Sequence, residues 1–588
     1  MRFPSLVTLS HRAGEVLRRF PWTLGLGVLT AAAAIAATTH HANHANSDWA
    51  RLAMVSALGL PLSVALTLFA EERGWSPGRV ALLNAGGVAL LGLFYLVWPG
   101  PERKHEAIRY FQLNAGLHLL VAVLPFLGER ETSAFWQYNR RLFLGFLRAA
   151  VFSAVLYLGL VVALVALDKL FGVDVPGELY GRLYLIIAFV INTWIFLAEV
   201  PRGLRELVDD TSYPRVLKVF AQYILTPLVF IYLLLLLAYL VKIVAGGEWP
   251  SGWIGWLVTS VAIAGLLGFL LVHPLRDDPG EAWIRTYTRW LFVGLIPAAV
   301  VLLVAFWKRV LPYGLTEMRL LGVLLGLWLL AIAVSYTLRQ ESGIKRIPVT
   351  LAALLLLTLY GPLSVTGISV ASQGRRLTRL VASRPGEPTA QDQRDGREAS
   401  AALRFLLEHG AQRQVAAAIP GELPRIDWDS LPDQRDKREK AAAQILAVAH
   451  VSYVPQYSSR SEGYIYLSAR QEPVTLIRGY DWMVRLSDYD KTPIVVERDT
   501  VHVQFDSASG ILGVKVGTDS LAFDLEKLAV GLSRDSDVSV PVPADRLGLE
   551  ATGAKRKARL ALESLNGRRR GSSVKVEHWQ GRLYLGTR

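Results

Sequence analysis

The sequence predicts an α-helical polytopic membrane bundle of about eleven transmembrane helices, followed by a soluble α+β C-terminal domain. Three observations predict this fold class. The 588 residues are 52% hydrophobic with a mean hydropathy of +0.33, more than a soluble protein of this charge usually carries. Apolar runs recur over the first 370 residues, and charged and turn residues become frequent only after them. We expect a transmembrane domain at 1–373, a linker at 374–398 and the soluble domain at 399–588.

The individual spans follow from length, because about 20 apolar residues are needed to cross about 30 Å of hydrocarbon as a helix. The first run exceeds an ordinary signal-peptide core, so it is interpreted as a retained helix. The run at 107–127 is the most polar, and every later span would invert if it failed to cross. The qualifying runs are 21–39, 52–70, 80–98, 107–127, 149–167, 183–200, 221–244, 253–272, 290–307, 320–338 and 348–370.

Orientation follows from the Lys and Arg residues of the short loops. With a cytoplasmic N-terminus, the inner loops hold the larger share, for example Arg140, Arg141 and Arg202. An odd number of spans then places the C-terminal domain outside. The prediction is a protein of the bacterial inner membrane with a cytoplasmic N-terminus and a periplasmic C-terminal domain.

The C-terminal domain shows both helical and strand patterns after a Pro-, Gly- and Gln-rich linker. Helical spacing occurs at 401–409, 437–450 and 555–565. Period-2 alternation and turn residues predict a hairpin of 501–505 with 511–516, and a terminal hairpin of 574–579 with 583–585. Further strands are expected at 464–467, 474–477, 482–486 and 494–497.

Two polar motifs stand at the entrances of predicted spans. The first is Phe135-Trp136-Gln137-Tyr138-Asn139-Arg140-Arg141, and the second is Tyr313-Gly314-Leu315-Thr316-Glu317-Met318-Arg319. With the many spans and the outer tail, these motifs make residues 50–370 resemble the domain-of-unknown-function 4153 (DUF4153) family of bacterial multi-pass membrane proteins. The resemblance implies architecture and location, and no mechanism.

The second motif is also the main candidate for ligand binding. Thr316 is an expected N-cap and Glu317 suits the first-turn dipole. Arg319, with Lys308 and Arg309 nearby in the sequence, could receive an anionic headgroup or substrate at the outer membrane surface. Tyr313 belongs to the same turn. The alternative is a capped re-entry turn whose arginine snorkels to the interface.

Two further sets of polar residues are candidates. Within the spans, Asn84, Asn114, His118 and Asn192 could mark a polar cavity, or they could simply join helices by hydrogen bonds. In the first outer loop, His40, His44 and Asp48 have a spacing that suits Zn²⁺ or Cu²⁺. The same loop can also be read as a low-complexity connector built on a His-Ala-Asn repeat.

These residues define no catalytic constellation and no cofactor, so an enzyme is not favoured. The absence of cysteine excludes thiol catalysis, and the basic residues are explained by topology, so nucleic acid is not an expected partner. The first functional hypothesis is a non-catalytic envelope scaffold whose partners are the lipid bilayer and other membrane or periplasmic proteins. The second is a transporter or flippase for a lipid-like cargo, and the third is a lipid-linked glycosyl or other group transferase. A cavity open near Arg319 would favour transport or transfer, whereas a filled bundle would favour the scaffold.

Overall fold

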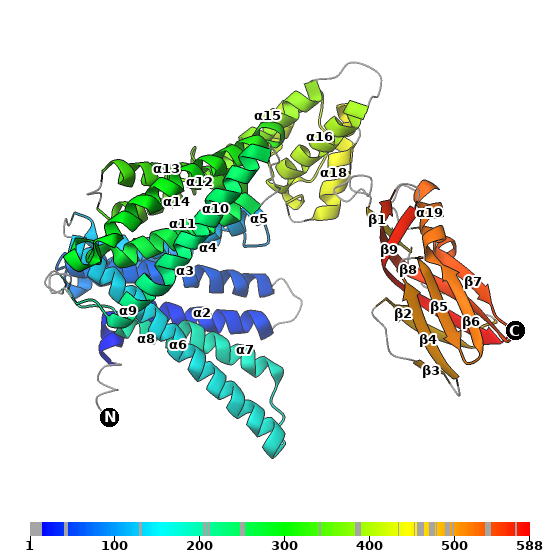
Figure 1. Cartoon of the computed structure of the whole chain (residues 1–588), viewed down its shortest axis with the longest axis horizontal. Coiled ribbons are helices and arrows are strands. Elements are labelled where there is room, and N and C mark those ends of the chain that lie inside the picture. The colour runs from blue at the N-terminus through cyan, green and yellow to red at the C-terminus, as the bar shows by residue number, and fades with distance from the viewer. Residues whose placement is uncertain are drawn as a thin grey trace. The chain divides into compact units, whose positions relative to one another are not determined.

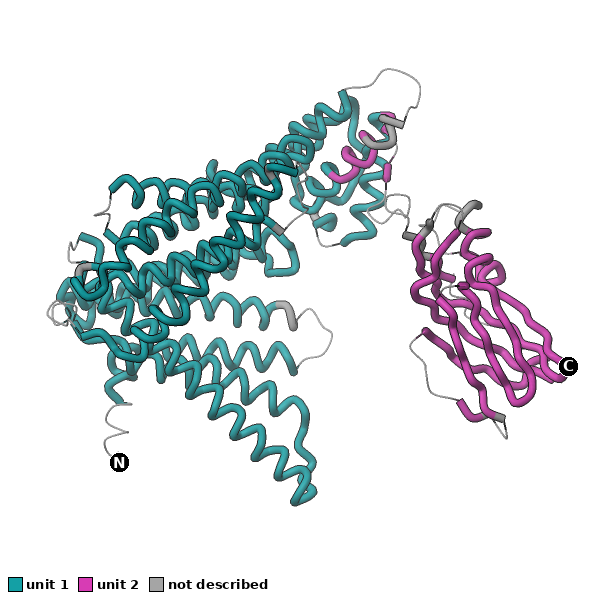
Figure 2. The backbone as a smooth tube through the Cα atoms, in the orientation of Figure 1, with its two compact units in different colours: residues 1–385, 402–449 teal, residues 386–401, 450–588 magenta. Residues whose placement is uncertain are grey.

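The computed structural model divides into two compact units, which are described separately (Figure 2). Unit 1 comprises residues 1–385 and 402–449, and unit 2 comprises 386–401 and 450–588. The structure describes residues 14–39, 45–128, 132–203, 207, 212–246, 253–339, 343–382, 390–432, 434–451, 453–454, 464–469, 477, 479–488, 494–496, 499–507, 509–535, 542–570 and 573–587.

Unit 1 is a bundle of long apolar helices, which confirms the membrane class (Figure 1). Among the described residues, ten helical segments are long and apolar enough to cross a bilayer. Two of them contain a π-helical segment, η2 (Ile187–Ile191) and η4 (Phe220–Leu225). The segments are α2 (Pro21–Thr39), α3 (Ala45–Glu72), α4 (Pro77–Val97), α5 (Lys104–Val123), α6 (Thr132–Phe171), α7 (Gly177–Ile186) with α8 (Asn192–Ala198), α9 (Arg215–Val219) with α10 (Thr226–Gly246), α11 (Trp253–Val272), α12 (Trp283–Tyr313) and α13 (Glu317–Leu338).

The eleventh predicted span, 348–370, is a broken helix. Helix α14 (Arg346–Leu357) has twelve residues, about 18 Å at 1.5 Å per residue. A turn follows in which Gly361 has φ +81°, and Pro362 comes next, so a continuous helix cannot pass through this dipeptide. Helix α15 (Val365–Ala382) begins after the turn, with the Ser364 hydroxyl accepting from the Gly367 amide. The Gly-Pro pair was the sequence signal for this break.

Contacts within unit 1 show which loops share an end of the bundle. His105, in the first turn of α5, stacks on His409, and His409 bonds Glu317, the first residue of α13. On α15, Gln373 donates to the Tyr313 carbonyl. The start of α5, the α12–α13 turn and the middle of α15 therefore lie at one end. The positive-inside count assigned the first two to the same face, which stays a prediction as regards the side of the membrane.

The predicted linker at 374–398 is largely helical where the structure describes it. Helix α15 continues to Ala382, and α16 runs from Ala390 to Glu408, longer than the predicted 401–409. Helices α17 (Gln412–Ala418) and α18 (Arg435–Val448) follow, the latter close to the predicted 437–450. Leu403, Leu406 and Leu407 are buried, as the apolar spacing of this segment requires.

Unit 2 contains two antiparallel sheets, and their buried residues form one core. One sheet has the order β1-β8-β9-β2, with β7 also paired to β8, and the other has the order β3-β4-β5-β6. The strands are β1 (Tyr464–Ser468), β2 (Trp482–Ser487), β3 (Ile494–Val496), β4 (Asp499–Asp506), β5 (Ile511–Val516), β6 (Asp519–Asp524), β7 (Gly548–Thr552), β8 (Arg556–Arg570) and β9 (Ser573–Thr587). Helix α19 (Leu525–Asp535), which no sequence pattern predicted, packs against β9. The predicted hairpin of 501–505 with 511–516 is confirmed as β4–β5, and most of the expected strand at 474–477 lies outside the described residues.

Two local predictions in this unit are wrong. The predicted helix at 555–565 is part of strand β8, where Ala558, Leu560 and Leu562 are buried at alternate positions, the period of a strand. The predicted terminal hairpin is one strand, β9, which pairs with β8. Gly581 was taken as a turn residue but lies within β9, where an added Cβ would come 2.7 Å from the Ala561 carbonyl oxygen. Glycine there permits a close approach of two strands.

Candidate functional site: a pocket at the α12–α13 turn

A pocket of about 680 Å³ lies between α11, α12 and α13, within the size range of ligand sites. Its walls are mainly apolar, and its described lining contains no acidic side chain. Three cations line it: Lys308 and Arg309 from the last turns of α12, and Arg319 from the first turn of α13. The apolar wall consists of Ile254, Trp256, Leu302, Ala305, Phe306, Leu321 and Leu325, with Thr259 and Thr316 as hydroxyl groups.

The structure thus brings together four of the five predicted ligand-binding residues. Lys308, Arg309, Thr316 and Arg319 line the pocket, whereas Tyr313 is 48% exposed beside it. Arg319 donates to the carbonyl oxygens of Tyr313 (3.2 Å) and Gly314 (2.9 Å). Thr316 stands at the N-cap position in an extended conformation, but its hydroxyl makes no cap hydrogen bond. The predicted re-entry turn and the cationic site are therefore the same structure, but Thr316 does not cap α13 through its side chain.

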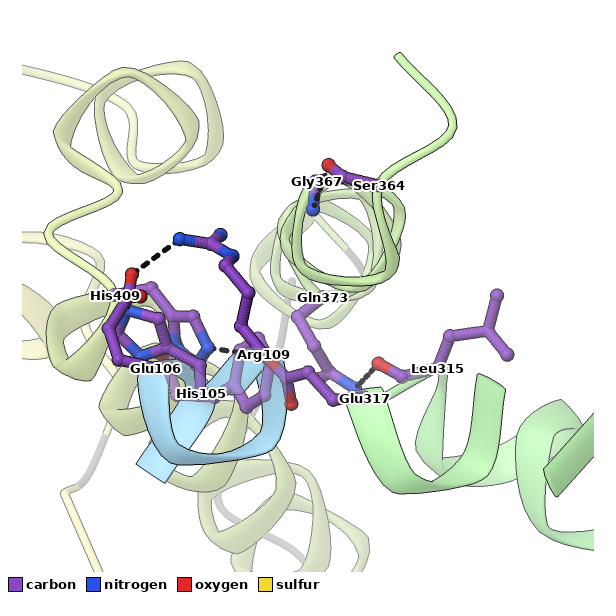
Figure 3. Close-up of polar contacts among 10 residues, drawn as sticks. His105, Glu106, Arg109, Leu315, Glu317, Ser364, Gly367, Gln373 and His409 are labelled. Atoms are coloured by element: carbon purple, nitrogen blue, oxygen red, sulfur yellow. Dashed lines mark hydrogen bonds and ion pairs between the residues drawn. The ribbon is translucent and has the colours of Figure 1, made fainter. Parts of the chain in front are cut away.

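Helix α15 braces this turn. The Gln373 amide donates to the carbonyls of Tyr313 and Leu315, each at 2.9 Å, and the Ser372 hydroxyl accepts from the Leu315 amide at 3.0 Å. Figure 3 shows Gln373 reaching the Leu315 carbonyl. Gly314 has φ +67° and ψ 175°, a region essentially restricted to glycine. An added Cβ there would come 2.9 Å from Gln373 Nε2, so glycine is needed both for conformation and for space.

Phe306 sets the shape of the apolar wall. An ideal Cβ built on Gly322 would come 2.1 Å from the Phe306 Cζ. Because Gly322 has no side chain, the ring of Phe306 fits between α12 and α13. Sequence reasoning missed this wall, because apolar residues that face a pocket look the same in a sequence as those that face lipid.

A buried ionic cluster adjoins the pocket and was also missed (Figure 3). Glu317, between the pocket residues Thr316 and Met318, lies 2.5 Å from His409 Nε2. The His105 ring stacks on His409 at 4.3 Å between centroids. Beside them, Glu106 accepts from Arg109 Nη1 at 2.6 Å. His409 is 92 residues from Glu317, so no local pattern could have paired them.

The predicted polar residues of the spans do not converge on a cavity in the described structure. Asn84 is 1% exposed, and its amide is bonded to Ser63 Oγ (2.8 Å), Thr67 Oγ1 (3.1 Å) and the Val80 carbonyl (3.0 Å). His118 is exposed and contacts the Asn114 carbonyl within its own helix. Asn192 begins α8 and is half-buried. These positions lie on three different segments.

The predicted metal site is mostly outside the described residues. His40 and His44 fall there, so no geometry can be stated for them. Asp48 is described, is exposed, and forms an ion pair with Arg51 at 2.9 Å. Over the described part of the chain, no group of three or more metal-ligating side chains is found.

The first sequence motif joins three helices of the bundle by hydrogen bonds. Tyr138 is fully buried, and its hydroxyl donates to the Val121 carbonyl at 2.8 Å. Trp136 Nε1 donates to the Leu270 carbonyl at 2.7 Å. The motif thus ties the start of α6 to α5 and α11. Its residues are packing and hydrogen-bonding partners between helices.

Comparison with known proteins gives a family. The model of a family described as "Domain of unknown function (DUF4153)" matches residues 25–389, which include the whole pocket. The uncharacterised protein PM1469 of Pasteurella multocida (strain Pm70) is similar, at 22% identity over 335 residues. This alignment covers 57% of the present chain and 54% of the relative, so it spans about half of the relative's length. No solved structure matches.

Proposed function

Since this chain belongs to the DUF4153 family, whose description assigns no activity, we propose from its own geometry that it binds an anionic, acyl-chained lipid in the α11–α13 pocket. The observation that carries the proposal is the pocket's composition: apolar walls and three cations, which come from the end of α12 and the start of α13. Such a cavity suits a molecule with an apolar body and an anionic head. The ligand class is a phospholipid-like anion.

The same pocket ranks the functional hypotheses. A cavity at Arg319 supports the handling of a lipid-like cargo, by transport or by transfer, over a purely structural bundle. The envelope scaffold is retained as a second function, because unit 2 is a folded module with a core of its own, suited to contact with other membrane or periplasmic proteins. The proposed location is the bacterial inner membrane, with the N-terminus in the cytoplasm and unit 2 in the periplasm, so the pocket would open at the outer leaflet.

The test uses phosphatidylglycerol with a photoreactive group in its acyl chain, added to the full-length protein in nanodiscs. Cross-links should map to α11–α13 and exceed those of the matching phosphatidylcholine. Arg309→Gln should weaken phosphatidylglycerol binding by about tenfold or more, since a charge-assisted hydrogen bond contributes about 1.5–3 kcal/mol. Arg309 suits this test because the α12–α13 turn is held by Arg319, Gln373 and Ser372.

Arg182→Gln is the matched control. Arg182 pairs with Glu178 on α7 and does not line the pocket, so its loss should leave binding unchanged. Equal labelling by phosphatidylcholine, or equal losses in the two variants, would refute the anionic lipid site.

A further inference from the structure

The pair His409–Glu317 is buried and connects two parts of unit 1. Glu317 begins α13, and His409 directly follows α16, the first long helix after the bundle. Their side chains are 7% and 5% exposed. The His409 ring stacks on Phe405 of α16 and on His105 of α5. The imidazole is therefore held in a fixed plane with its two nitrogens directed at defined partners.

Both nitrogens of this imidazole face oxygen acceptors. His409 Nδ1 lies 2.7 Å from the Phe405 carbonyl oxygen, and Nε2 lies 2.5 Å from Glu317 Oε1. A carbonyl can only accept, so Nδ1 must carry a hydrogen. A neutral imidazole has one such hydrogen, which would leave the Nε2 lone pair facing a carboxylate oxygen. A contact at hydrogen-bond distance needs one more proton, on the imidazole or on the carboxyl group.

We propose that His409 and Glu317 form a proton-binding site that latches the end of α16 to the first turn of α13. With the proton present, every acceptor has a donor. Without it, a carboxylate and a lone pair oppose each other in a buried place, where such an unmatched contact is costly. The latch is therefore closed when the proton is bound and open when it is lost.

The neighbouring charges on α5 distinguish this pair from a simple ion pair. Glu106 is neutralised by the permanent cation Arg109, with the His105 ring 3.5 Å from the same carboxylate oxygen. Arg109 in turn lies over the Tyr360 ring. Arginine stays charged at all accessible pH values, whereas histidine changes charge near neutrality. The negative charge of Glu106 is balanced by Arg109 at every accessible pH. The Glu317 carboxylate is balanced only while the proton that it shares with His409 is present.

The latch lies directly beside the pocket in the sequence of α13. Glu317 stands between Thr316 and Met318, which line the pocket, and two residues before Arg319. The proton site involves no ligand, so the spin-label test of the latch is independent of the cross-linking test of lipid binding.

The test measures a distance by pulsed electron paramagnetic resonance. Because the chain has no cysteine, spin labels can be placed on Leu363→Cys and Ala416→Cys, both exposed positions of unit 1. We expect a narrow distance distribution at about pH 6 and a broad one at about pH 9, because the shared proton that closes the latch is lost as the pH rises.

Two variants separate the proton from the contact. Glu317→Gln should stay narrow at both pH values, because its amide can donate to Nε2 of neutral His409 while Nδ1 keeps its bond to Phe405. His409→Ala should be broad at both. His118→Ala, an exposed histidine of α5, should follow the unmodified chain. A wild-type distribution that stays narrow at both pH values, a Glu317→Gln variant that still broadens, or a narrow His409→Ala variant would overturn the proposal.

Discussion

The bundle contains two groups of polar side chains that differ in their surroundings. On α2, α3 and α4, the side chains of Thr23, Ser63, Thr67 and Asn84 bond one another in a buried chain with distances of 2.8–3.1 Å. At the α12–α13 end, Lys308, Arg309 and Arg319 line an open pocket. Hydrogen bonds between buried polar side chains join helices, whereas cations that line an apolar cavity are placed to meet an anionic ligand. The function of a polar side chain in the bundle therefore has to be judged by whether it lines a cavity.

The largest expected effect comes from breaking the turn that presents the cations. Gly314→Ala forces a side chain into a glycine-only conformation and against Gln373, at a cost of about 1–3 kcal/mol. Both phosphatidylglycerol binding and thermal stability in detergent should fall. Gly361→Ala, at another positive φ with open space around it, should lower stability while leaving binding intact. If both variants lose lipid binding, the loss reflects general instability and not the conformation of the α12–α13 turn.

A change in the α2–α4 group should lower stability alone. Asn84→Leu removes three hydrogen bonds within the membrane, each worth about 0.6 kcal/mol on average, so stability should fall by about 1–2 kcal/mol with no change in lipid binding. Unfolding in detergent measured beside the cross-linking assay checks this. Asn114→Leu, at a half-buried position, serves as the milder comparison. If Asn84→Leu reduces binding as strongly as Arg309→Gln, the distinction between the two groups fails.

The smallest effect is expected from changing the pocket's apolar wall. Gly322→Ala would displace the Phe306 ring into the cavity, since the new Cβ would occupy the position of the ring's edge. A flexible ring can move, so lipid affinity should fall only about threefold, or about 0.7 kcal/mol. Gly92→Ala on α4 has nothing within 4 Å and should change nothing. If Gly322→Ala binds lipid normally, the acyl chain does not contact the wall formed by Phe306.

The sequence predicted the features that repeat or lie close together along the chain. Span length predicted eleven crossings, and ten long apolar helices are found in the described part of the chain. The cations at 308, 309 and 319 could be grouped because they flank one turn. The segment 555–565 was predicted as a helix, although the burial of Ala558, Leu560 and Leu562 in strand β8 has the period of a strand. The α11 wall of the pocket and the partner of Glu317 come from distant segments, and no periodicity encodes which helices meet.

The early end of α14 has an electrostatic consequence. A helix carries about half a negative charge at its C-terminus, on carbonyls that lack partners within it. Gln112 of α5 donates to the Leu355 carbonyl at 2.8 Å and to the Thr358 hydroxyl at 2.7 Å. In the turn that follows, Thr358 Oγ1 donates to the Leu354 carbonyl and the Leu359 amide donates to the Leu356 carbonyl, so these terminal carbonyls have donors. Arg109, one turn earlier on α5, lies over Tyr360 just beyond the break. The last turn of α14 has no basic residue of its own, so the groups that stabilise its C-terminus come from α5, a segment more than 240 residues earlier in the chain (Gln112 and Leu355 are 243 residues apart).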